Sequence, residues 1–165
     1  QPCLRPVDSP LRIRLACCEL YNENVYDLLS GQPAVSTSGK RSLAVLEHPD
    51  VGVYVENLAT LLAQSPKDFE RIAAFATAQR STAGHLMNSK SSRSHSIITV
   101  LLVEGSEPDC KADEGPAARE INALKKTAVP MQKLLLTGKV RGQLNLVDLA
   151  GSERPARTGA VSETC

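Results

Sequence analysis

Two stretches of sequence decide the fold: Asn88-Ser89-Lys90-Ser91-Ser92-Arg93-Ser94-His95 and Leu146-Val147-Asp148-Leu149-Ala150-Gly151-Ser152-Glu153. Each adjoins an apolar run that is typical of a buried β-strand. The first stretch supplies hydroxyls and an arginine. The second places a carboxylate at a strand end, then a glycine and a second carboxylate. A nucleoside triphosphate with magnesium requires such groups around its terminal phosphate.

Either stretch alone has a plain structural explanation. Asp148 and Gly151 would suit a strand followed by a polar turn, and Ser91–His95 would suit a solvated loop or, given the Arg93-Ser94 spacing, a phosphorylation target. The combination reverses this interpretation, because two such stretches, each joined to a buried strand, are very unlikely to occur together by accident. A carboxylate at the carboxyl end of a buried strand also lies where open α/β sheets bind ligands. Gly151 has no Cβ, so its N–H can come close to a phosphate.

The composition is that of about one globular domain. The 165 residues are 42% hydrophobic and 22% charged, with a net charge of +1, which gives no overall field to attract nucleic acid or an anionic membrane. The longest apolar stretch, Ile97–Val103, is far shorter than the ~20 residues of a membrane span. Residues 1–20 lack the apolar core of a signal peptide. We therefore expect an intracellular, soluble protein that binds neither nucleic acid nor membrane.

The five cysteines do not predict a zinc site. Their number is odd and no C-x-x-C pair occurs, so reduced thiols of a cytosolic protein are the better interpretation. Cys17 and Cys18 are adjacent and should face opposite sides of a strand.

Apolar periodicity predicts three strands and one helix. Strands are expected over Leu11–Leu20, Ser96–Val103 and Val140–Leu149, the last two in the core. Ser65-Pro66-Lys67-Asp68 is a helix start, with Ser65 as the cap and Asp68 completing a capping-box-like pattern. This helix should run from Pro66 to about Ser81.

The other segments predict a small hairpin, an insert and irregular ends. Leu43–Leu46 and Gly52–Val55 are expected to pair as a hairpin. Residues 1–10 should be irregular, and residues 11–165 should form one domain. Within it, a flexible insert is expected over about 104–139, because residues 104–127 hold Gly, Pro, Glu, Asp and Lys with few apolar side chains. A short helix, interrupted by Pro130, is expected within Lys125–Leu136.

The two stretches together resemble switch I and switch II of the kinesin motor domain. Glu19–Leu29 resembles a strand-and-turn segment of that family, and Gly52–Leu58 resembles its small β-lobe. The resemblance covers about residues 11–103 and 140–160. It implies an α/β fold of the P-loop-NTPase type, in which a mixed sheet is flanked by helices and carries a small β-hairpin lobe.

The resemblance also implies a site for ATP and Mg²⁺. Ser92 would help coordinate magnesium, and Asp148 would hold a magnesium-bound water. Ser91 would lie beside the terminal phosphate, and Asn88 would shape the start of switch I. These residues, with Gly151, form the expected cofactor-binding set.

Closure of the two switches would depend on Gly151 and on two further groups, Arg93 and Glu153. Gly151 would donate its N–H to the γ-phosphate, and Arg93 would pair with Glu153 around the attacking water. The expected catalytic set is therefore Ser91, Ser92, Arg93, Gly151 and Glu153.

The chain departs from the family pattern because it lacks the phosphate-binding P-loop motif. No G-x-x-x-x-G-K-[ST] occurs in it, and the family carries this P-loop upstream of the segment that the chain resembles. Without the P-loop lysine and its helix N-terminus, we expect nucleotide binding by these residues alone to be very weak. The expected tubulin-facing hairpin, Glu47–Asp50, is also poor in Lys and Arg. The resemblance further implies that the strand Val140–Leu149 lacks its neighbour, which would make it an apolar edge strand that invites aggregation or a partner.

Three functional interpretations follow. In the first, the chain is part of a microtubule motor ATPase, with microtubules as its partner and the cytoplasm and cytoskeleton as its location. In the second, it is a truncated, non-hydrolysing product that binds tubulin or another partner. In the third, it does not fold stably. The oligomeric state, cargo and direction of movement stay open, because no neck, stalk or tail is present in these 165 residues.

Overall fold

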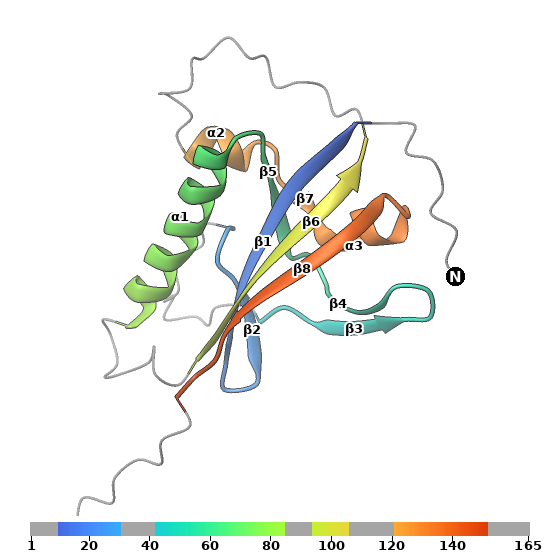
Figure 1. Ribbon diagram of the computed structural model, residues 1–165. Helices are drawn as coiled ribbons and strands as arrows, with labels where there is room; N and C mark the ends of the chain where they lie inside the picture. Colours follow the sequence, from blue (N-terminus) through green and yellow to red (C-terminus); the bar gives the residue numbers. More distant parts are fainter. Residues whose placement is uncertain (1–9, 31–41, 85–93, 106–120, 152–165) are drawn as a thin grey trace, which may run out of the picture.

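The computed structural model describes residues 10–30, 42–84, 94–105 and 121–151. Figure 1 shows a twisted sheet with α1 on one side and α3 on the other, and a separate small hairpin below α3. The strands are β1 (Leu11–Tyr21), β2 (Asn24–Asp27), β3 (Val45–His48), β4 (Gly52–Val55), β5 (Ala59–Ala63), β6 (His95–Glu104), β7 (Val129–Pro130) and β8 (Val140–Asp148). The helices are α1 (Pro66–Gly84), α2 (Ile121–Lys125) and α3 (Met131–Leu136).

The main sheet is built around β1. Its strand order is β7-β5-β1-β6-β8, with β2 paired to β1 beside this path. All the described pairings are antiparallel. The predicted α/β architecture, in which a sheet is flanked by helices and carries a small hairpin lobe, is confirmed; of the expected mixed sheet, the described pairings form an antiparallel part.

Alternating side chains of β1 build a core on each face of the sheet. Leu15 and Cys17 pack on the side of α1 and α2, in a cluster with Leu28, Leu29, Leu61, Ile72, Ala76 and Leu124. Ala16 and Cys18 pack on the other side, in a cluster with Val25, Leu58, Leu101, Val103, Met131 and Leu134. The prediction that the two cysteines face opposite sides is confirmed, and both thiols are free and buried.

A buried arginine joins β1 to the segment between α2 and β7. Arg14 is 1% exposed, and its Nη1 donates to the main-chain oxygens of Thr60 at 3.1 Å and Thr127 at 2.9 Å. A buried guanidinium is stable only when such acceptors replace its water. Arg14 therefore fixes β5 and the segment after α2 against the central strand.

Asp27 closes the turn after β2. Its Oδ1 accepts hydrogen bonds from the N–H groups of Leu29 (2.7 Å) and Ser30 (3.2 Å), and its Oδ2 accepts one from Ala59 (3.0 Å). A short carboxylate side chain that captures nearby N–H groups is a common way to close a turn. This one also ties the turn to the first residue of β5.

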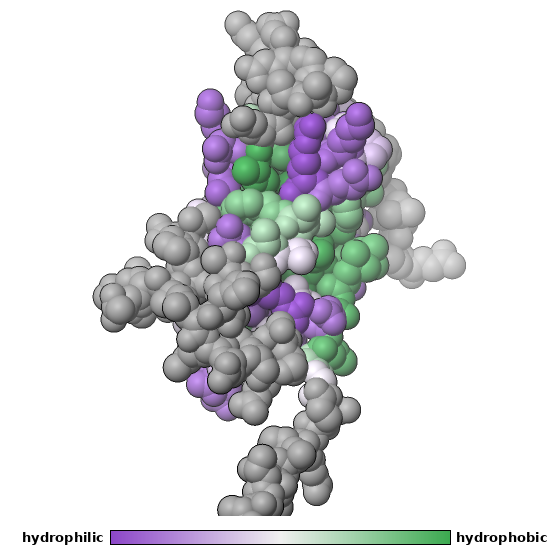
Figure 2. Space-filling view, turned by 90° about the vertical axis from the view of Figure 1, so that its left-hand side faces the viewer, coloured by the Kyte–Doolittle hydropathy of each residue, from purple (hydrophilic) through white to green (hydrophobic). Residues whose placement is uncertain are grey.

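The start of α1 is capped as the sequence predicts. Ser65 Oγ accepts from the Asp68 N–H at 3.2 Å, and Asp68 Oδ2 accepts from the Gln64 N–H at 3.1 Å. Two N–H groups at the helix start are thus satisfied reciprocally. Figure 2 views the molecule from the side on which α1 lies, and apolar side chains are visible there between hydrophilic ones. Among the described residues, no helix has the length and apolar character needed to cross a bilayer.

Several expected boundaries differ in the structure. The first hairpin strand is β3, at Val45–His48 rather than at 43–46, while Gly52–Val55 is confirmed as β4. The flexible insert expected over about 104–139 begins beyond β6, and its residues 121–136 carry α2, β7 and α3. These short elements are held by packing, since Leu124, Met131 and Leu134 are buried. Residues 1–9 and 106–120 lie outside the described residues.

The strand β8 was expected to be an apolar strand of the core type that lacks a neighbour, and the described sheet confirms that it is an edge strand. It pairs only with β6 there, and Leu144, Leu146, Val147 and Leu149 at or beside it are 57%, 45%, 52% and 69% exposed. An irregularity separates the pairs Leu102↔Gly142 and Val103↔Val140, so Arg141 has no opposite residue. This is the pattern of a β-bulge, which inserts one extra residue into one strand of a pair.

Candidate functional site

The candidate site lies where β6 begins and β8 ends. These strands are antiparallel neighbours, and Ser96 is the direct partner of Asp148. Register therefore brings the end of the first decisive stretch, Ser94-His95, beside the middle of the second, Asp148–Gly151. Segments about 50 residues apart in the chain meet at one corner of the sheet.

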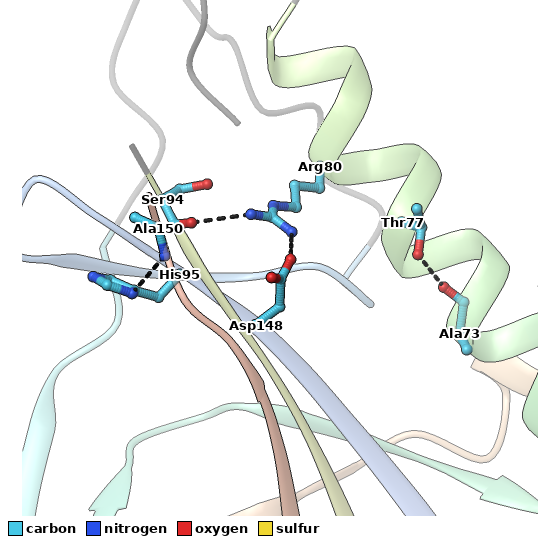
Figure 3. A network of polar contacts seen from close by, with 7 residues as sticks. All are labelled: Ala73, Thr77, Arg80, Ser94, His95, Asp148 and Ala150. Carbon is cyan, nitrogen blue, oxygen red and sulfur yellow. Dashed lines mark hydrogen bonds and ion pairs between the residues drawn. The ribbon is translucent and has the colours of Figure 1, made fainter. Parts of the chain in front are cut away.

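A direct hydrogen bond joins the two stretches. The N–H of Ala150 donates to Nδ1 of His95 at 3.0 Å, as Figure 3 shows. His95 is the first residue of β6, and Ala150 lies two residues beyond the end of β8. The bond continues the contact between the strands past the last ladder pair, and so fixes the backbone immediately before Gly151.

An arginine of α1 reaches both stretches. Arg80 Nη1 lies 2.5 Å from Asp148 Oδ2, and Arg80 Nη2 donates to the main-chain oxygen of Ser94 at 3.0 Å. Figure 3 shows the guanidinium between these two acceptors, one from each strand. The Arg80 side chain is 17% exposed and that of Asp148 is 69% exposed. The carboxylate is therefore accessible, while the group that contacts it is largely enclosed.

Sequence reasoning missed Arg80, although a signal for it exists. Ile72, Ala76 and Arg80 follow one another at intervals of four, so they lie on one face of α1. Ile72 and Ala76 are buried against the sheet. A cation that ends such an apolar stripe must face the same sheet, and a carboxylate at its corner is the expected partner.

Of the predicted site residues, the structure places Asp148 and Gly151. Both lie at the carboxyl end of β8, and Gly151 is exposed. The remaining five, Asn88, Ser91, Ser92, Arg93 and Glu153, lie outside the described residues, so their predicted roles stay predictions. Ser94 directly follows the first four of these. Its hydroxyl is buried and has no hydrogen-bond partner among the described residues.

The chemistry available at this corner is that of one accessible carboxylate. The described part of the chain has no group of three or more His, Cys, Asp or Glu side chains that could hold a metal ion. A single accessible carboxylate can accept a hydrogen bond from a water bound to Mg²⁺, which takes oxygen ligands and dehydrates reluctantly. Asp148 therefore fits a Mg²⁺-bound water.

Comparison with known proteins gives one consistent family. The model of the kinesin motor domain matches residues 5–165. The chain is 36% identical over 159 residues to kinesin-like protein KLP1 of Chlamydomonas reinhardtii, covering 95% of this chain and 16% of that protein. It is 32% identical over 156 residues to kinesin-like protein klp-20 of Caenorhabditis elegans, covering 94% of this chain and 19% of the relative.

A solved structure has the same fold. It is described as the structure of a fast kinesin, with implications for ATPase mechanism and interactions with microtubules. The TM-score is 0.61 at 28% sequence identity, and the match covers 97% of this chain and 36% of that one. The chain therefore spans well under half the length of the relatives that it matches.

Proposed function

The chain belongs to the kinesin motor-domain family, and on that premise we propose that it is part of a microtubule motor that couples ATP hydrolysis to movement. In this proposal the two decisive stretches are switch I and switch II, the segments that respond to the γ-phosphate. The motor acts in the cytoplasm on the microtubule cytoskeleton. ATP with Mg²⁺ supplies the phosphoryl group whose transfer to water drives the cycle.

The observation that carries the proposal is the pairing of Ser96 with Asp148. A γ-phosphate sensor needs both switch segments at one place, so that one ligand can bias both. Antiparallel pairing of β6 with β8 supports this, because the residues after Asp148 and those before His95 leave the sheet at the same corner.

The described residues have separate roles in the proposal. Asp148 accepts a hydrogen bond from a magnesium-bound water through its accessible carboxylate. Gly151 donates its N–H toward the γ-phosphate, and the His95–Ala150 bond steadies the backbone just before it. These groups orient the water and phosphate, which is most of what a phosphoryl-transfer site must do.

The predicted residues outside the described part complete the proposed site. Ser92 coordinates magnesium, Ser91 contacts the terminal phosphate, and Asn88 shapes switch I. Arg93 and Glu153 form the ion pair that closes the two switches around the attacking water.

The test is the ATPase rate of the full-length protein with and without microtubules. We expect ATP hydrolysis that microtubules accelerate, and a large loss of that rate in Asp148→Asn. The 165 residues alone should bind ATP far more weakly than the full-length protein, because they contain no P-loop lysine. A full-length protein that neither binds ATP nor responds to microtubules would overturn the proposal.

A second candidate is a non-hydrolysing module that binds tubulin or another protein. The exposed apolar side chains of β8 favour it, because an open strand edge is a ready surface for pairing. Co-sedimentation with microtubules at equal affinity in ATP, in ADP and without nucleotide would support this candidate. Nucleotide-dependent binding would exclude it in favour of the motor.

A further inference from the structure

The β3–β4 hairpin is connected to the main sheet by a short joint. Its two strands form a sheet of their own, and residues 56–58, the hairpin joint, lead from β4 into β5. Within the joint, Asn57 has a φ of +59°, in the left-handed region that asparagine tolerates better than most residues. The chain therefore turns at Asn57, and the orientation of the hairpin depends on the contacts that hold this residue.

A segment far from the joint in the sequence follows it residue by residue. β7 pairs with the first two residues of β5. The next residue, Met131, donates its N–H to the main-chain oxygen of Leu58 at 2.8 Å, and Gln132 then contacts Asn57. Residues 129–132, the support segment, thus hold consecutive residues of β5 and the hairpin joint in antiparallel order.

The contact between Gln132 and Asn57 is reciprocal. Oε1 of Gln132 accepts a hydrogen bond from the Asn57 main-chain N–H at 2.7 Å, and Nε2 of Gln132 donates to Asn57 Oδ1 at 3.3 Å. A primary amide carries a donor and an acceptor side by side, so it can bind the backbone and the side chain of Asn57 together. A change in the backbone conformation of Asn57 would break at least one of these bonds.

The support segment is itself anchored on both faces of the main sheet. Met131 and Leu134 of α3 are buried in the core cluster on one face, and Leu124 of α2 is buried in the cluster on the other. Lys125 of α2 places its Nζ 4.3 Å from the ring centre of Phe75 in α1, a distance typical of a cation–π contact. Figure 1 shows α2 and α3 on opposite sides of the sheet, with β7 between them in the chain. The segment is therefore rigid enough to hold the hairpin joint.

We propose that the support segment fixes the hairpin in one orientation on the main sheet and so presents its exposed side chains to a protein partner. Val45, Leu46 and Val53 are the exposed apolar residues of the hairpin. The partner is the microtubule, so this part of the inference rests on the proposed function. A binding surface that is held in place before binding loses less conformational entropy when the complex forms, which raises its affinity.

The first experiment measures hydrogen exchange by mass spectrometry in the full-length protein, in peptides that contain Asn57. In Gln132→Ala the Asn57 N–H loses its acceptor, so we expect its exchange to become about three- to tenfold faster, the range for one hydrogen bond. Gln132→Glu keeps an oxygen at the position of Oε1 and should retain most of the protection. Unchanged exchange in Gln132→Ala would overturn the inference.

A second pair of variants tests the backbone bond to Leu58. Met131→Pro removes the N–H at the first residue of α3, where proline is tolerated, and Pro130 already has the extended ψ of 132° that a following proline requires. Met131→Ala removes the same side chain but keeps the N–H, so it is the matched control for lost packing. The hairpin joint should exchange faster in Met131→Pro than in Met131→Ala. Equal exchange in two folded variants would also overturn the inference.

The third measurement is the microtubule affinity of the full-length protein by co-sedimentation in ADP. We expect Gln132→Ala to weaken binding about three- to tenfold, because the hairpin must then be ordered on binding. The affinity for ADP and the melting temperature should stay unchanged, since the two bonds of Gln132 lie at the surface. Gln143→Ala is the matched control, because it removes an exposed glutamine of β8 whose Nε2 donates to Asn145 at 3.1 Å. It should leave both microtubule affinity and exchange at Asn57 unchanged.

The outcomes separate this inference from the proposed function. Faster exchange at Asn57 with unchanged microtubule affinity would overturn the inference and leave the proposed function standing. A wild type that binds no microtubules would refute the proposed function, and the two exchange experiments would then decide whether the support segment fixes the hairpin.

Discussion

Arg14 donates a 2.9 Å hydrogen bond to the main-chain oxygen of Thr127, 113 residues farther along the chain. The same nitrogen bonds the main-chain oxygen of Thr60 in β5, and the side chain is 1% exposed. One buried cation therefore closes the sheet at β5 and holds the segment that leads from α2 into β7. Its removal would leave two carbonyl groups without their donor in a place that water reaches poorly.

We expect Arg14→Ala to lower the free energy of unfolding by about 3 kcal/mol, the sum of unsatisfied buried acceptors and lost packing. Arg14→Lys should lose less, since an ammonium keeps the charge and can serve one of the two carbonyls. Urea denaturation followed by circular dichroism measures both. Equal stability of Arg14→Ala and wild type would contradict the assigned role.

Asp27 offers a second stability test. Its two oxygens accept from the N–H groups of Leu29, Ser30 and Ala59. Asp27→Ala removes all three acceptors and should cost about 2–3 kcal/mol of unfolding free energy. Asp27→Asn keeps one carbonyl oxygen in place and should cost less. The order Ala below Asn below wild type, in urea midpoints, is the expected result; an inverted order would show that the carboxylate does not close this turn.

The two buried thiols predict a loss of stability at high pH. Burial, with added repulsion from Cys18 and Asp27, raises the pKa of Cys17 from its ordinary 9.0 to about 12. Burial, with repulsion from Asp27, raises the pKa of Cys18 to about 11. The unfolded chain releases these protons near pH 9 while the folded chain retains them, so the thiols favour unfolding increasingly from pH 9 to about 12.

The measurement is the urea midpoint between pH 8 and pH 11. A Cys17→Ala/Cys18→Ala variant keeps all the lysines and tyrosines, so it is the control for their titration. The midpoint of wild type should fall more steeply than that of the variant. Parallel curves would mean that the thiols ionise equally in both states.

The exposed apolar edge at β8 predicts self-association of the 165-residue chain. Leu144 and Val147 point to opposite faces and are 57% and 52% exposed. A lysine at either position should reduce light scattering at equal protein concentration, because charges on an edge strand discourage strand pairing. Val53→Lys is the matched control, since Val53 is 69% exposed in the separate hairpin. Equal reduction by all three substitutions would point to a general charge effect.

Local patterns were enough to predict the strongest elements. The alternation of apolar and polar residues in β1 is a local signal, so this strand could be predicted from sequence. The same is true of the start of α1, where Ser65 and Asp68 bond to N–H groups only three or four residues away. The segment 121–136 could be predicted only in part: the short helix expected within Lys125–Leu136 is present as α3, but α2 and β7 were not predicted. Its elements are two to six residues long and are stabilised by distant partners, as in the bond from the Met131 N–H to the Leu58 oxygen at 2.8 Å.

The candidate site likewise contains residues that the sequence identifies and residues that only the fold reveals. Asp148 and Gly151 stand in a recognisable stretch at a strand end, so sequence alone identified them. The spacing of Ile72, Ala76 and Arg80 indicates that Arg80 faces the sheet, but it does not identify the acceptors of Arg80, because Asp148 and Ser94 are 68 and 14 residues away. Contacts between residues that are far apart in the sequence depend on how the elements are arranged in space, which a local residue pattern does not reveal.

The bulge at Arg141 determines where this strand can change in length. Arg141 is the one residue of β8 without an opposite residue on β6, between the pairs Leu102↔Gly142 and Val103↔Val140. Deleting it would give regular pairing and leave every other side chain on its own face, at the cost of the Arg141–Glu104 ion pair. A deletion nearer to Asp148 would turn the residues between it and the bulge to the opposite face. Relatives that differ by one residue in this strand should therefore carry the difference at the bulge, far from the corner where β6 begins.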